Sequence, residues 1–152
     1  MTTHVYDRDL KEAFDLFKDS PDIQQFLYKF ATYCHLIDDV IDVKEIRDNP
    51  QSILKVTHLA LDIYSSQFFR DNVSLLHPII LMIHNTYADS VEWEHSEIKW
   101  KATQADTLRC FGNEIILVLI ERVFGYDKMR EFSTKIREGS YKRHHTEDGK
   151  QI

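Results

Sequence analysis

The chain has 152 residues, of which 43% are hydrophobic, and a formal net charge of −6 from 19 basic and 25 acidic side chains. This length suits one domain with a buried core, and the negative balance argues against a general nucleic-acid binder. No apolar run approaches the ~20 residues of a membrane span, and charged residues fill the start of the chain, where a secretory signal would be apolar. We therefore expect a soluble, cytoplasmic protein.

Apolar residues at helical spacing and two proline-containing caps organise the first half of the chain. Ser20-Pro21 and Asn49-Pro50 each have the form of an N-cap followed by proline at the first helical position. Apolar residues between these caps recur every three or four positions, which predicts one long helix. The helices expected here cover about residues 7–18, the segment between the two caps, and about residues 50–70.

Helices are also expected throughout the second half. His77-Pro78 has the form of a helix start, and Ser96 is a candidate cap for a helix over about residues 97–124. Gly125 is a natural stop before a last helix in the polar segment DKMREFSTKIRE. The chain is thus predicted to form a single all-α bundle of five or six helices over residues 1–152. From about residue 138 it continues as a polar tail that contains His144 and His145.

The two cysteines, Cys34 and Cys110, lie within apolar helical patterns and have no partner motif nearby. We expect reduced, buried thiols that act as small hydrophobic side chains. The sequence has no CxxC pair, which excludes a structural zinc site of the cysteine-rich kind.

The segment IILVLI, residues 115–120, is apolar on every side of a helix. Such a segment is typically surrounded by other helices. Polar residues at its ends are then drawn toward the interior, where polar groups must be paired or bind a ligand. Asn113, Glu114 and Glu121 are conspicuous for this reason.

An acidic cluster interrupts the long helix between the two caps, in the segment HLIDDVID. His35, Asp38, Asp39 and Asp42 follow the i, i+3, i+4, i+7 spacing, so they share one helical face. Carboxylates one turn apart repel each other, and a divalent cation would turn that repulsion into attraction. The simpler interpretation is that this face is only the solvent side of an amphipathic helix.

The same segment resembles the first aspartate-rich motif, DDxxD, of the class I isoprenoid synthases. The resemblance implies an all-α fold in which Asp38, Asp39 and Asp42 bind Mg²⁺ or Mn²⁺ that holds a prenyl diphosphate, with His35 facing the same cavity. The chain is much shorter than members of that family. A related arrangement would therefore be a shortened form, or would need a homodimer to enclose the site.

The terpene-cyclase branch of that family adds a second metal motif, (N/D)DxxSxxxE. Asn113 and Glu121 match this motif in kind and spacing, and Glu114 stands in place of its aspartate. Leu117 replaces the hydroxyl ligand, which is a departure from the motif. Arg109 lies one turn before Asn113, and a guanidinium suits diphosphate oxygens. The resemblance thus implies metal ligation by Asn113 and Glu121 and diphosphate binding by Arg109.

Asp89 and Glu92 lie one turn apart on the fourth predicted helix and offer a different metal site. Opposed to Asp39 and Asp42, they would form an acidic quartet on two facing helices, similar to the Mg²⁺ site of the MazG-like nucleotide pyrophosphohydrolases. Glu114 is a further second-choice ligand. Glu92 and His95 also form ExxH, the ligand unit of ferritin-like di-iron bundles, but the partner glutamates of that site are not evident.

Two classes of function therefore stay open. One is a Mg²⁺-dependent enzyme that acts on a diphosphate, in which the metal would neutralise the leaving pyrophosphate. The other is a non-enzymatic helical protein that assembles or binds a partner. In that case the acidic face would be solvent-exposed, and the large aromatic side chains would form the contact patch. The candidates for this patch are Phe68, Phe69, Trp93 and Trp100.

Overall fold

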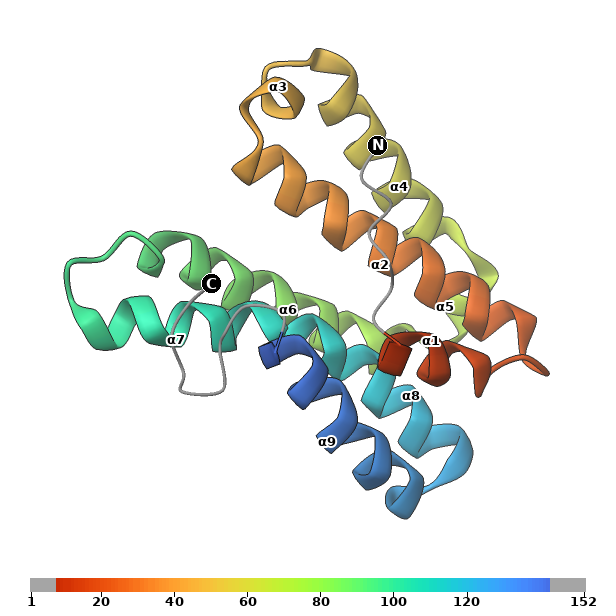
Figure 1. The fold of residues 1–152 in the computed structure, drawn as a ribbon. Helices are drawn as coiled ribbons and strands as arrows, with labels where there is room; N and C mark the ends of the chain where they lie inside the picture. Colours follow the sequence, from red (N-terminus) through yellow and green to blue (C-terminus); the bar gives the residue numbers. More distant parts are fainter. Residues whose placement is uncertain (1–7, 143–152) are drawn as a thin grey trace. The chain divides into compact units, whose positions relative to one another are not determined.

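The computed structural model describes residues 8–142 and contains helices but no strand in that range, which confirms the all-α prediction (Figure 1). Within these residues, no helix combines the length and the apolar character needed to cross a membrane. The chain divides into two compact units. Unit 1 comprises the described residues 8–16 and 77–142, and unit 2 comprises residues 17–76. The single-domain organisation stays a prediction.

Unit 2 is a helical hairpin. The long helices α2 and α4 pack against each other, and the short helix α3 lies in the connection between them (Figure 1). Phe26, Leu27 and Phe30 of α2 and Ile63 of α4 are buried, and the ring of Phe26 lies 5.1 Å from that of Phe68. The helices of this unit are α2 (Pro21–Asp42), α3 (Lys44–Arg47), α4 (Pro50–Ser65) and α5 (Gln67–Asp71).

The helix starts predicted in this unit are confirmed. Pro21 and Pro50 occupy the first turns of α2 and α4, and the side chain of Asn49 accepts a hydrogen bond from the backbone N–H of Gln51. The single helix expected over about residues 50–70 is wrong, because the backbone is extended at Ser66. The Ser66 hydroxyl donates to the carbonyl of Ile63 and accepts from the N–H of Phe69, so this residue ends α4 and begins α5.

Unit 1 is also entirely helical in its described residues apart from the connections. Helices α8 and α9 form a hairpin, and α1 packs on α9 (Figure 1). The prediction that IILVLI is buried is confirmed, because residues 115, 116, 117, 119 and 120 are 0–5% exposed. The elements of this unit are α1 (Arg8–Asp15), α6 (Val73–Trp93), α7 (Lys99–Arg109), the 3-10 helix η1 (Cys110–Asn113), α8 (Glu114–Phe124) and α9 (Tyr126–Lys142). Helix α6 begins in the last residues of unit 2.

Two predicted boundaries in this part of the chain are wrong. Pro78 does not open a helix but lies inside α6, where it removes one backbone donor from the ladder and its ring crowds the carbonyl one turn earlier. The helix expected over about 97–124 is divided by η1, so the described residues hold more helical segments than the five or six expected. The stop at Gly125 is confirmed, with φ of 90°. Helix α9 continues to Lys142, past the expected start of the tail, and His144 and His145 lie outside the described residues.

Candidate functional site

The acidic face of α2 lies in unit 2. His35, Asp38 and Asp39 are half-buried, whereas Asp42 is exposed at the last residue of the helix. Burial, and to a smaller extent the negative charge of Asp38 one turn along the helix, raise the pKa of the Cys34 thiol to about 12. Asp38 and Asp39 are thus partly shielded from solvent on this face, whereas Asp42 is not.

The second predicted motif lies in unit 1, and its residues contact α9. The side-chain amide of Asn113 donates to the hydroxyl of Ser140 at 3.0 Å. Glu114 accepts a hydrogen bond from the guanidinium of Arg137. Leu117 is 3% exposed and belongs to the core, whereas Glu121 is exposed. Asn113, Glu114 and Leu117 thus help to hold η1 and α8 in unit 1. Metal binding shared with the aspartates of unit 2 stays a prediction.

Arg109, the predicted diphosphate ligand, joins α7 to α6. Its Nη2 lies 2.6 Å from Oε2 of Glu94, and its Nε donates to the hydroxyl of Ser90 at 3.3 Å. The guanidinium also lies over the ring of Tyr87, 5.6 Å from the ring centre. Ser90 is fully buried, and the side chains of Arg109 and Glu94 are about a quarter exposed. A diphosphate at Arg109 would have to compete with the Glu94 carboxylate.

The 3-10 helix η1 accounts for the different surroundings of Arg109 and Asn113. An α-helix turns about 100° per residue and a 3-10 helix about 120°. Over the four steps from Arg109 to Asn113 the difference grows to about 80°. Side chains that a continuous helix would place on one face are thereby turned apart. This agrees with the contacts of Arg109 on α6 and of Asn113 on α9.

The aromatic residues expected to form a contact patch do not form one surface. Phe69 is buried, and Phe68 is half-buried in unit 2 beside Phe26. In unit 1, Trp93 and Trp100 meet edge to face with ring centres 5.4 Å apart, and Lys101 lies over both rings. Trp100 is the most exposed of the four expected residues.

An exposed apolar surface that the sequence analysis did not single out lies on α4. We define the outer seam of α4 as the side chains on the side opposite the buried residues Ser52 and Ile63. Its apolar members are Ile53, Leu54, Leu61 and Tyr64, with exposed fractions of 53%, 59%, 65% and 43%. Thr57 lies between them, and its hydroxyl donates to the carbonyl of Ile53, so its methyl group adds to the apolar surface. In the sequence, apolar residues recur at helical spacing on two faces of this helix, and this pattern could have revealed the exposed surface.

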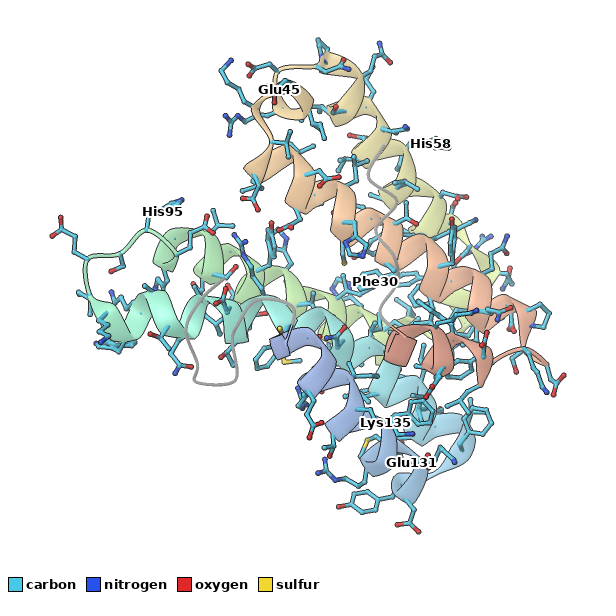
Figure 2. All side chains as sticks on the ribbon, viewed as in Figure 1. Phe30, Glu45, His58, His95, Glu131 and Lys135 are labelled. Atoms are coloured by element: carbon cyan, nitrogen blue, oxygen red, sulfur yellow. The ribbon has the colours of Figure 1, made fainter. Side chains whose placement is uncertain are left out.

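His58 borders this outer seam and projects from the side of α4 that faces away from α2 (Figure 2). On the same flank, Asp62 forms an ion pair with Lys29 of α2 at 2.8 Å. The pKa of the Asp62 carboxyl is lowered first by the hydrogen bond from Lys29 and then by the positive charges of Lys29 and His58. The border of the outer seam is therefore polar, as is usual at the rim of a binding surface.

The second-choice metal ligands are dispersed in unit 1. Asp89 is half-buried, Glu92 and His95 are exposed, and Glu114 is paired with Arg137. Across the part of the chain that the structure describes, no group of three or more His, Cys, Asp and Glu side chains is placed to hold a metal ion. Comparisons with protein-family models, with curated proteins and with solved structures give no match.

Proposed function

We propose that this protein is a helical interaction protein that binds a partner through the outer seam of α4. The observation that supports this function is that α4 carries two apolar faces, one packed on α2 and one exposed. Contiguous exposed apolar side chains with a polar border are typical of protein-binding surfaces. A second helix laid along α4 would cover the outer seam as an amphipathic helix covers a groove.

The size of the outer seam suits a modest interaction. From Leu54 to Tyr64 the helix rises about 15 Å, which is two to three turns. Full burial of one leucine side chain contributes about 1.5–3 kcal/mol. Leu54 and Leu61 would supply the centre of the contact, and Tyr64 would add an aromatic anchor. Such a surface is small compared with a permanent interface, so we expect reversible binding.

Site-specific photo-crosslinking in cells tests this function. A photoreactive amino acid replaces Leu61 in the outer seam, and the control carries it at Thr134, an exposed position of α9. We expect protein adducts at position 61 that are absent at position 134. Adding Leu54→Glu should abolish these adducts, because it puts a charge in the centre of the contact. Equal adduct yields at positions 61 and 134 would contradict the proposed function.

A second candidate function is binding of a diphosphate through Mg²⁺ or Mn²⁺ at Asp38, Asp39 and Asp42. It is supported by the shared face of these residues on α2 and by the partial burial of Asp38 and Asp39. Crowded, partly dehydrated carboxylates repel each other without a metal, and the metal would relieve this repulsion. Binding to the folded state alone would stabilise the protein by about 2.7 kcal/mol at a hundred times the Kd.

Melting curves recorded with EDTA and with Mg²⁺ test the metal site. We expect Mg²⁺ to raise the Tm of the unaltered protein and to leave that of Asp39→Asn unchanged. In EDTA, Asp39→Asn should melt above the unaltered protein because one of the repelling charges is gone. Asp22→Asn, an exposed change in the first turn of the same helix, should respond to Mg²⁺ as the unaltered protein does. Coincident curves of the unaltered protein in the two buffers would count against this site.

A further inference from the structure

We propose that the partner on the outer seam of α4 is a second copy of this chain, with the two α4 helices packed antiparallel around a two-fold axis. This inference rests on the proposed function and names its partner. It is carried by the spacing of the apolar residues and by the charges beside them. The spacing is the same in both directions along α4, and the charges have opposite signs at nearly matching positions. The outer seam of one copy therefore fits the outer seam of a second copy that runs in the opposite direction.

The spacing of the apolar residues in the outer seam is the same when it is read in either direction along the helix. Leu54, Thr57, Leu61 and Tyr64 are separated by three, four and three positions, as in the core of an antiparallel pair of helices. Leu54 and Tyr64 lie at equal distances from Leu59, and so do Thr57 and Leu61. A two-fold axis opposite Leu59 therefore places Leu54 against Tyr64 of the second copy.

The side chains brought together in this way differ in size. The small Thr57 meets Leu61 of the second copy, and each leucine thus faces a side chain of another size. Alternation of large and small side chains across a contact allows the two surfaces to interdigitate. The Thr57 hydroxyl is already bonded to the carbonyl of Ile53, so no unpaired donor would be buried beneath the contact.

The charges beside the outer seam favour the same orientation. Lys55 and Asp62 lie on one flank of α4, four positions before and three positions after Leu59. An antiparallel two-fold pair keeps this flank on the same side in both copies and brings Lys55 of each copy to nearly the height of Asp62 of the other, whereas a parallel two-fold pair would put the two flanks on opposite sides of the contact. The carboxylate of Asp62 is ionised at neutral pH, as an ordinary aspartate is, and Lys29 lowers its pKa further. Opposite charges at matching positions select both register and orientation.

The terminal segments outside the described residues are poor candidates for covering the outer seam. By sequence, residues 1–7 and 143–152 contain too few apolar side chains for two turns of helical contact. A second copy supplies a complete set of matching apolar and charged positions. Association costs translational and rotational freedom. In a two-fold dimer this cost is offset by two identical sets of contacts.

Analytical ultracentrifugation of the purified full chain, from micromolar to millimolar concentration, tests the proposal. We expect a monomer–dimer equilibrium. Leu61→Glu should weaken the dimer at least about hundredfold, since two buried leucines are lost in each dimer. The control is Leu81→Glu, which alters an equally exposed leucine of α6 and should leave the equilibrium unchanged. Equal effects of the two changes, or none from either, would overturn the proposal.

Charge reversal tests the orientation separately. Lys55→Asp and Asp62→Lys should each weaken the dimer about two- to thirtyfold, because each places like charges together at two symmetric sites. The double variant, combined with Lys29→Glu so that the charge facing position 62 within the chain is reversed as well, should restore the dimer, since an antiparallel pair then joins Asp at position 55 to Lys at position 62. Circular dichroism of each variant confirms that the fold is kept. A combined variant as weak as the two single changes taken together would overturn the antiparallel arrangement.

The outcomes separate this inference from the function on which it rests. If the chain is monomeric at all concentrations and position 61 crosslinks to a different protein, the second copy is wrong and the proposed function holds. If the chain is monomeric and position 61 gives no specific adduct, both are wrong. If crosslinked adducts at position 61 consist of two copies of this chain, both are supported.

Discussion

Helices α8 and α4 are both apolar around most of their circumference, yet their surroundings differ. In α8, Ile115, Leu117 and Ile120 are almost completely buried within the chain. In α4, Leu54 and Leu61 are more than half exposed, although residues on the opposite side of the same helix are buried. An apolar helix surface needs a neighbour on each side to exclude water. Residues 115–120 of α8 are thus largely covered by the described part of unit 1, whereas the outer seam of α4 is left exposed by the described part of unit 2.

The most severe way to test this comparison is to make the same change in both helices. Leu117→Ser should lower the free energy of unfolding by about 3–5 kcal/mol, because it leaves a cavity and buries a hydroxyl group. Leu61→Ser should change it by about 0.5 kcal/mol or less in the monomer, because the side chain is already exposed. Urea unfolding at low protein concentration measures both values. A loss at position 61 as large as that at position 117 would mean that the outer seam is packed.

Leu117→Ser also completes the hydroxyl position of the second metal motif. If metal binds at Asn113 and Glu121, the added hydroxyl completes the ligand set. Mg²⁺ should then raise the Tm of the variant by more than it raises the Tm of the unaltered protein. If these residues serve only to pack α8 and α9, the loss of stability should be the same with and without Mg²⁺. The same unfolding series in the two buffers separates these outcomes.

A smaller effect is expected at the two ends of α8. Gly125 follows this helix with φ of 90° and ψ of 174°, a conformation that only glycine adopts without strain. Gly125→Ala should therefore cost about 1–3 kcal/mol. Gly112 in η1 has a negative φ, and a Cβ atom there would meet no atom within 4 Å. Gly112→Ala should be neutral or stabilise by up to about 1 kcal/mol. Thermal unfolding of the two variants checks this contrast.

The smallest effect concerns the ion pair beside the outer seam of α4. Because Lys29 lowers the pKa of Asp62, the pair contributes stability above the unfolded carboxyl pKa of about 3.9 and loses it as the pH falls through this region. Lys29→Met should therefore flatten the fall in stability below about pH 4. Lys99→Met, a change of an exposed lysine at the start of α7, should leave that slope unchanged. Acid titrations of Tm for both variants test the assignment.

Much of the fold could be predicted because local chemistry determines helix ends. The amide of Gln51 needs an acceptor that Asn49 supplies, and the chain after α8 needs a positive φ that Gly125 allows. The division at η1 and the position of Pro78 inside α6 could not be predicted in this way. A proline tolerated within a helix and a change from α to 3-10 geometry depend on the neighbouring helices, which a linear pattern does not contain.

The candidate site was less predictable than the fold, because residue spacing does not determine contacts between helices. Helical spacing placed Asp38 and Asp39 on one face of α2. The same counting could not show that Asn113 would bond to Ser140 or that Arg109 would pair with Glu94, since these partners are 27 and 15 residues away. The outer seam was hidden for a related reason. A leucine such as Leu61 contributes to helical periodicity whether or not a neighbour covers it.

The environment of Cys34 has a practical consequence for chemical labelling. A thiol with a pKa of about 12 holds roughly one thiolate in 10⁵ molecules at pH 7, whereas an ordinary thiol holds a few per cent. Alkylating and oxidising reagents attack the thiolate, so Cys34 should react very slowly with them. A cysteine introduced at an exposed position such as Thr134 should be modified long before Cys34. Once the other cysteine, Cys110, is replaced by serine, spectroscopic probes can therefore be attached to the chain while the native thiol beside Asp38 is left in place.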